Sequence, residues 1–151
     1  MVTKYQIAGE IGEEWIKKAV ICPRCSRGKL KILPKNFKCA DMICDFCGFL
    51  GQVKSKRVKS KTERLNVVLG AAWKPQKERL DAGIYHSLFI VKLVKEKPVQ
   101  IVMIPPDAQR KSGFFVPRKP LSKTARRAGW QGFVYDLRIL KPGEVKILWE
   151  K

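Results

Sequence analysis

Cys22-Pro23-Arg24-Cys25 and Cys44-Asp45-Phe46-Cys47 decide the fold of this chain, and eighteen residues separate the two quoted stretches. The two sulfurs of a CxxC turn point toward one centre, and two such turns at this separation are typical of a zinc site. Because thiolates fill all four corners of the tetrahedron, no corner remains for water, and we predict a structural zinc over residues 22–47. The alternative is four reduced thiols in the core. Cys39 is left over, and we expect it to be a small core residue.

An acidic residue lies inside this motif, and an amide-x-lysine sequence follows it. Asp41 precedes Cys44 by three residues, and Gln52-Val53-Lys54 lies just beyond the last cysteine. Residues 49–55 are predicted to form a strand, so Gln52 and Lys54 would project from the same face. An acid followed by an (acid or amide)-x-lysine is the outline of a metal-dependent nuclease site.

The chemistry of such a site assigns a role to each residue. Mg²⁺ or Mn²⁺ prefers oxygen ligands, which Asp41, the Gln52 amide and the Val53 carbonyl offer. The Lys54 ammonium would hold the attacking water or stabilise the developing negative charge. A second carboxylate would come from the preceding helix, from Glu13 or Glu14. The alternative is that Asp41 is a turn residue and that Gln52 and Lys54 belong to a solvated strand face.

Composition indicates the partner. The chain has 151 residues, 32 Lys+Arg against 13 Asp+Glu, and a net charge of +19. Such a charge attracts polyanions, and we expect double-stranded DNA rather than a membrane surface. No apolar run approaches transmembrane length, and the first ten residues lack the apolar core of a signal peptide, so we expect a cytoplasmic protein. The length predicts one domain, residues 1–151.

Hydrophobic periodicity predicts the main elements. Helices are expected over 8–20, from Thr62 through Trp73 to a stop at Pro75, and over 76–82. Strands are expected over 30–33, 37–40, 49–55, 133–137 and 145–149, and a hairpin over 87–94 and 99–104. Residues 107–120 read as an irregular basic loop. The lone histidine, His86, is expected in the core or at a strand edge, which gives a Cys-His or Ser-His hydrolase little support.

Two segments are rich in cations. The first follows the candidate site, and its predicted phosphate-contacting residues are Lys56, Lys59, Lys61 and Arg64. The second, residues 118–130, combines cations with one aromatic and is predicted to be a DNA clamp of Arg118, Lys119, Lys123, Arg126, Arg127 and Trp130. The alternatives are a solvated loop for the first segment and, for the second, a basic surface loop with Trp130 in the core.

Several of these stretches resemble one family. Arg118-Lys119-Pro120-Leu121 and Thr124 to Trp130 are similar to a segment of the DpnI family of restriction endonucleases, which cut adenine-methylated DNA. The spacing of the cysteines and of Asp41, and Glu13-Glu14-Trp15 ahead of Cys22, extend the resemblance over nearly all of the chain. It implies an α/β fold with a restriction-endonuclease-like PD-(D/E)xK core, a mixed sheet flanked by helices, and an inserted four-cysteine zinc motif.

The resemblance also implies catalytic roles for Asp41, Gln52 and Lys54 with Mg²⁺ or Mn²⁺. Two departures matter. Position 52 is Gln where the family motif has Glu, which lowers the negative charge of the metal site. The resemblance does not extend to the winged-helix domain that reads DNA in the family, so we expect no separate winged-helix domain and expect a partner subunit or a dimer to supply specificity.

Two functions therefore stay open. The first is a divalent-metal-dependent DNA endonuclease of the methyl-directed restriction type or a related repair or mobile-element nuclease. The second is a zinc-stabilised DNA-binding module whose cleavage is weakened or lost through Gln52. A zinc ribbon that binds RNA is a third and weaker reading.

Overall fold

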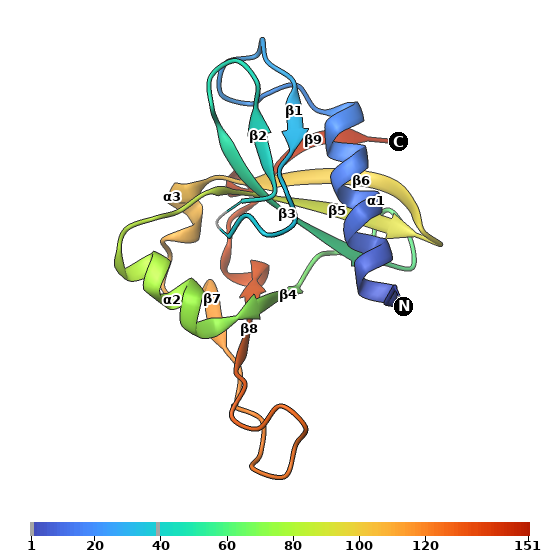
Figure 1. The fold of residues 1–151 in the computed structure, drawn as a ribbon. Helices are drawn as coiled ribbons and strands as arrows, with labels where there is room; N and C mark the ends of the chain where they lie inside the picture. The colour runs from blue at the N-terminus through green and yellow to red at the C-terminus, as the bar shows by residue number, and fades with distance from the viewer. Residues whose placement is uncertain (1, 39) are drawn as a thin grey trace.

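The computed structural model describes residues 2–38 and 40–151, in which a mixed six-stranded sheet forms the centre (Figure 1). The strand order is β1-β2-β3-β5-β6-β9, and β3 and β5 form its only parallel pair within the described residues. The strands are β1 (Leu30–Ile32), β2 (Met42–Cys44), β3 (Leu50–Arg57), β5 (Ser87–Val94), β6 (Lys97–Ile104) and β9 (Lys146–Glu150). The chain is thus a mixed α/β protein, as predicted.

The hairpin of β5 and β6 is the interior of this sheet. All residues of β5 except Val94 are buried, because apolar layers cover both faces of the sheet. Lys95 and Glu96 make the turn with φ of 50° and 64°, the left-handed conformation that a two-residue type I′ hairpin requires. The predicted hairpin is confirmed, although β6 begins two residues earlier than expected.

One face of the sheet is covered by helix α1 (Lys4–Ala19). The helix starts four residues before the predicted position because Thr3 caps it: the Thr3 hydroxyl accepts from Gln6 N, and the Gln6 side chain accepts from Thr3 N. This reciprocal pair satisfies two backbone donors that a helix start otherwise leaves open. Ala8 and Ile16 bury the inner side of the helix against the core.

The other face is covered by a smaller antiparallel sheet of order β4-β8-β7. Its strands are β4 (Val67–Ala72), β7 (Phe115–Pro117) and β8 (Gly132–Asp136). A cluster of aromatic rings, among them Phe114, Phe133 and Tyr135, fills the space between the two sheets. The predicted strands over 133–137 and 145–149 are confirmed as β8 and β9, shifted by one residue.

The predicted helix from Thr62 to Trp73 is wrong. Residues 67–72 form β4, which pairs with β8 across 60 to 69 positions of sequence, so no local signal marks the partner. Helix α2 (Trp73–Asp81) begins where the prediction ends. Pro75 lies in its first turn, where a missing N–H costs no hydrogen bond, and it therefore opens the helix instead of ending one.

Two smaller predictions are also corrected. The strand expected over 37–40 is not formed by the residues described there; Phe37 N closes a turn on Pro34 O, and the partner of β1 is β2, at Met42–Cys44. Cys39 lies outside the described residues. The region 107–120 is less irregular than expected, because it contains helix α3 (Pro106–Gln109) and β7, and Phe114 is fully buried.

Short 3-10 turns, η1 (Leu137–Ile139) and η2 (Pro142–Glu144), join β8 to β9. Among the described residues, no helix is long and apolar enough to cross a membrane.

Candidate metal centre and nuclease site

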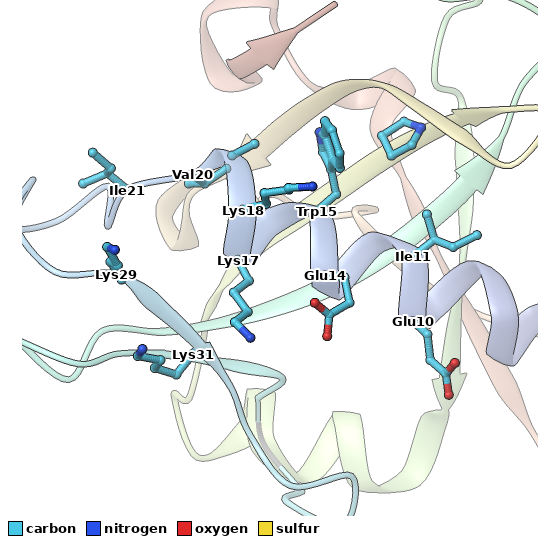
Figure 2. Close-up of a pocket in the computed structure, with 12 residues that line it drawn as sticks. Glu10, Ile11, Glu14, Trp15, Lys17, Lys18, Val20, Ile21, Lys29 and Lys31 are labelled. Carbon is cyan, nitrogen blue, oxygen red and sulfur yellow. The ribbon is translucent and has the colours of Figure 1, made fainter.

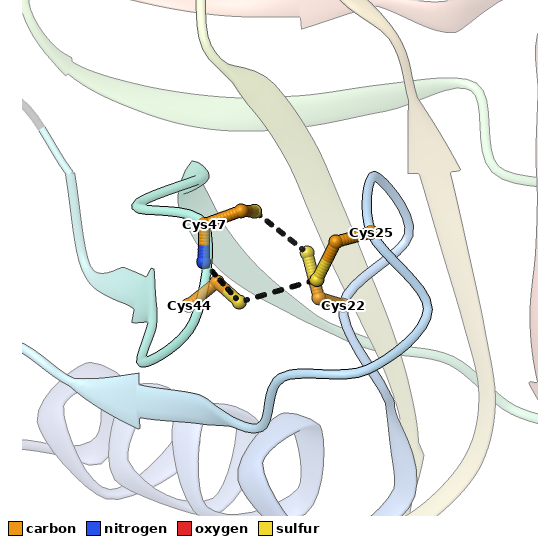
Figure 3. Close-up of side chains that lie close together, drawn as sticks. All are labelled: Cys22, Cys25, Cys44 and Cys47. Carbon is orange, nitrogen blue, oxygen red and sulfur yellow. Dashed lines mark hydrogen bonds between the residues drawn. The ribbon is translucent and has the colours of Figure 1, made fainter.

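The four predicted cysteines converge on one point (Figure 3). Their sulfur atoms all lie within 4.8 Å of one another, and the distances Cys22–Cys47 and Cys25–Cys44 are 3.6 and 3.7 Å. Four thiolates around a zinc ion at about 2.3 Å have sulfurs about 3.8 Å apart, so the spacing fits a tetrahedral zinc site. The four thiols are therefore not scattered through the core but form a cluster with the geometry of a metal site.

Backbone donors surround the sulfurs. Gly28 N donates to Cys25 Sγ at 3.3 Å, and Phe46 N and Cys47 N donate to Cys44 Sγ at 3.3 and 3.4 Å. Hydrogen bonds from the backbone of Gly28 and Arg27 lower the pKa of Cys25 to about 6, which favours the thiolate that binds metal. A Cβ at Gly28 would lie 2.2 Å from Cys44 Sγ, so glycine is needed for the chain to pass over the cage.

The cage also fixes the loop that carries Asp41. Cys44 ends β2, Asp41 directly precedes that strand, and Asp45 accepts a hydrogen bond from Lys29 N at 2.9 Å. The cysteine turns thus clamp β1 and β2 together. A zinc ion in this cage would contribute folding energy rather than chemistry, since thiolates occupy every corner.

Asp41 lies at an open stretch of the edge of β3. Strand β2 pairs with β3 only at Leu50 and Gly51, so the next backbone donor on that edge, Val53 N, has no strand partner there. The Asp41 carboxylate replaces the strand, because Asp41 Oδ2 accepts from Val53 N at 2.8 Å. One carboxylate oxygen is thereby fixed by the backbone, and the second remains for a cation.

Gln52 and Lys54 alternate with buried Gly51 and Val53 along β3, which puts both on the face turned away from α1. Burial lowers the pKa of the Lys54 ammonium, while the negative charges of Asp41 and Glu13 act in the opposite direction. The predicted pair Asp41 and Lys54 is therefore brought together. Gln52, two residues before Lys54, is half-buried and contributes an uncharged amide.

Glu13 joins this group from α1, which makes it the better of the two helix carboxylates considered. Burial raises the pKa of Glu13 to about 7, and the charge of Asp41 acts in the same direction; Glu14 is exposed. The neighbouring Gly12 explains the close approach: a Cβ there would lie 2.2 Å from Ser55 Oγ, which donates to Ala8 O at 2.7 Å. The helix thus packs against the Ser55 side chain of β3 with no side chain of its own at position 12.

Helix α2 contributes a cation that no sequence motif marks. The Arg79 charge lowers the pKa values of both Lys54 and His86, in each case after burial as the main cause. Arg79 also lines a pocket of about 650 Å³ with Lys38, from the loop ahead of Asp41. Arg79 thus brings a cation from a distant part of the chain to the candidate site. His86 is half-buried just before β5, close to the strand-edge position expected for it.

The first basic segment is divided by the structure. Lys56 is part of β3 and lines a second pocket of about 650 Å³ with Lys54, Arg57 and Lys4, between α1 and β4. The other three residues, Lys59, Lys61 and Arg64, are exposed beyond the far end of β3 from Asp41. The buried ammonium of Lys92 fixes this region through Lys61 O and Glu63 O, at 3.1 and 2.7 Å.

The second basic segment forms a finger, defined here as residues 118–131, that projects from the body of the molecule (Figure 1). Backbone bonds close it at its base, from Arg118 N to Gly132 O and from Leu121 N to Trp130 O. Its predicted cations are all exposed: Arg118, Lys119, Lys123, Arg126 and Arg127. The Arg127 guanidinium lies 4.6 Å from the centre of the half-buried Trp130 ring. Trp130 is thus a support of the finger rather than a core residue.

A family model described as DpnI, Dam-replacing family, matches residues 2–150. The match therefore includes the cysteine cage, the strand with Gln52 and Lys54, and the finger.

Proposed function

We propose, from the premise that this chain belongs to the DpnI (Dam-replacing) family, that it is a divalent-metal-dependent endonuclease acting on double-stranded DNA. In this proposal residues 1–151 act as one nuclease unit with a PD-(D/E)xK core and a structural zinc. The cytoplasm is the compartment where such an enzyme meets DNA.

One observation carries the proposal: the Asp41 carboxylate is bonded to Val53 N at the open edge of β3, and the charges of Asp41 and Glu13 both act on the pKa of the Lys54 ammonium. Two carboxylates and an ammonium at a strand edge are the groups that phosphodiester hydrolysis requires. Mg²⁺ or Mn²⁺ bound to these oxygens would neutralise charge on the phosphate and help to ionise a water.

The chain's own residues have distinct roles in this proposal. Asp41 is the main oxygen donor, the Gln52 amide and the Val53 carbonyl are neutral donors, and Glu13 restores the negative charge that Gln52 lacks. Lys54 is half-buried and cationic, so its ammonium holds the attacking water or stabilises charge on the phosphate. Because the metal depends partly on the DNA phosphate for its ligands, metal and DNA bind cooperatively.

DNA is held, in the proposal, by Lys56 in the pocket next to Lys54 and by the finger. The guanidinium and ammonium groups of the finger are exposed and contact phosphates. Lys59, Lys61 and Arg64 extend the basic surface beyond the far end of β3. A partner subunit or a second copy in a dimer supplies sequence specificity.

The test is a cleavage time course on plasmid with and without adenine methylation, in Mg²⁺ or Mn²⁺. We expect slow cleavage by the unmodified protein, faster with Mn²⁺, and an increase on the order of tenfold for Gln52→Glu, because a second fixed charge raises metal affinity. Asp41→Asn keeps an acceptor for Val53 N but removes the charge, so it should abolish cleavage. Asp107→Asn, at an exposed acid in α3, is the matched control.

The outcomes separate the candidate functions. If Gln52→Glu stays inert on every substrate while it is folded and bound to DNA, the chain is a DNA-binding module without cleavage, which the uncharged Gln52 favours. If Asp41→Asn cuts as fast as the unmodified protein, the assignment of the site is wrong.

A further inference from the structure

A groove of about 930 Å³ runs along the second half of α1, outside the residues assigned to DNA above. Figure 2 shows its lining: α1 crosses the view, and the edge of the cysteine-held module, β1 with the residue before it, lies alongside. Four of the lining residues are cations, namely Lys17, Lys18, Lys29 and Lys31.

Three of these lysines share one side of the groove for a structural reason. Lys29 and Lys31 flank the fully buried Leu30, so strand alternation turns both side chains outward. Lys17 lies on the exposed face of α1 and points into the same space (Figure 2). Among the residues that the structure describes, none of the three takes part in an ion pair.

The cysteine-held module fixes the backbone that carries Lys29 and Lys31, whereas Lys17 is carried by α1. Lys29 N donates a hydrogen bond to the side chain of Asp45, which lies between Cys44 and Cys47 in the sequence. The backbone of Lys29 also forms an antiparallel β-bridge with Ile21, next to Cys22. Two acids line the groove, but Glu10 is already paired with Lys35 at 3.1 Å, which leaves Glu14. Within the described part of the chain, four lining lysines without an ion pair against one such acid give the groove a net positive charge.

The groove leads toward the candidate site. Lys35 follows β1 in the chain, and its charge opposes the rise in the pKa of Glu13, so the two side chains are near one another. Glu13 in turn is near Asp41. The groove therefore has Glu10 and its partner Lys35 at the end that lies near the two carboxylates.

We propose that Lys17, Lys29 and Lys31 bind the phosphate backbone of the DNA that flanks the scissile position. The cysteine-held module is then a DNA contact in addition to a scaffold. The choice of DNA as the polyanion rests on the proposed function. The positive charge of the groove comes from the lysines and does not depend on that function. Neutralised phosphates release counterions, so the contact should appear in the salt dependence of binding.

The experiment measures binding by fluorescence anisotropy with a labelled duplex of about 30 base pairs, without divalent metal, over a series of salt concentrations. The test variant is Lys17→Gln/Lys29→Gln/Lys31→Gln. The matched control is Lys95→Gln/Lys97→Gln/Lys146→Gln, which removes the same charge from exposed positions on β6, β9 and the β5–β6 turn. Zinc content and thermal unfolding show that each variant is folded.

We expect the slope of log K against log salt to fall by about 2 to 3 in the test variant and to change little in the control, since each lost phosphate contact removes about 0.9. A hydroxyl-radical footprint should lose protection on one flank. An equal fall in both variants, or no fall in either, overturns the inference. Unchanged DNA binding with lost binding to poly-glutamate would assign the groove to an acidic protein and also overturn it.

The two proposals fail separately. If the test variant loses the flank but the unmodified protein never cuts DNA, the nuclease function is wrong and the groove remains a DNA contact. If the unmodified protein cuts DNA and the test variant binds as well as the control, only the groove assignment is wrong.

Discussion

The cysteine-held module, residues 22–47, and the finger, residues 118–131, are both basic and both poor in regular structure, yet different forces hold them. The module has two three-residue strands and a cluster of four sulfurs within 4.8 Å. The finger is closed by backbone bonds and by Arg127 over Trp130. The module carries Asp41, which needs a fixed position, whereas the finger carries exposed cations that can adapt to a duplex. The cysteine cluster, the more rigid of the two supports, thus lies where the chemistry is expected.

The largest effect should follow from breaking the cage. Cys44→Ser, or strong chelation of the unmodified protein, should unfold the module and abolish both zinc content and cleavage, because structural zinc contributes roughly 10 kcal/mol or more of folding free energy in small zinc domains. Elemental analysis and circular dichroism measure this. One zinc per chain is expected before treatment, and a well-folded protein purified without zinc would contradict the comparison.

An intermediate effect is expected in the finger. Reversing charge with Arg126→Glu/Arg127→Glu should weaken DNA binding and reduce the salt slope by about 2, because two phosphate contacts are lost. Zinc content and thermal stability should stay unchanged, since the finger has little share in the core. A drop in stability comparable to that of the cage variant would show that the finger is a structural element.

The smallest effect is expected from adding a single methyl group, by a Gly→Ala substitution, to each of the two regions. Gly129→Ala in the finger meets no atom within 4 Å, but φ there is +76°, so the cost should be about 1–2 kcal/mol of local conformational strain, with global unfolding little changed. Gly28→Ala in the module meets Cys44 Sγ and should weaken zinc binding. Thermal unfolding and zinc competition measure the pair; equal effects of both variants would remove the distinction.

Local signals account for the elements that the sequence predicts correctly. The cysteine spacing predicts the cluster, and dense β-branched runs predict β5 and β6, because each feature lies within a few residues. The helix expected from Thr62 to Trp73 fails because Leu65, Leu69 and Trp73 imitate helical spacing, whereas the pairing of β4 with β8 decides the structure. The start of α1 at Lys4 is set by its N-cap, Thr3, and a search for hydrophobic periodicity does not detect caps.

The same distinction applies to the site. Asp41 and Lys54 lie close to each other in sequence, so their proximity can be predicted; their catalytic role remains a prediction. Arg79 reaches the same region only through α2, whose position depends on the second sheet, and no pattern within the sequence of α2 indicates it. Glu13 could be considered from the sequence, but its choice over Glu14 required the orientation of α1.

The contact between Gly12 and Ser55 controls how closely α1 approaches β3, and with it the distance between the carboxylates of Glu13 and Asp41. Ser55 Oγ is bonded to Ala8 O, so a side chain at position 12 must either break that bond or push α1 away from β3. Glu13 would move with the helix, while Asp41 stays with the cage. The separation of the two carboxylates is thus adjustable from a residue with no functional group. A search for variants of altered metal preference should therefore include this glycine alongside the charged residues.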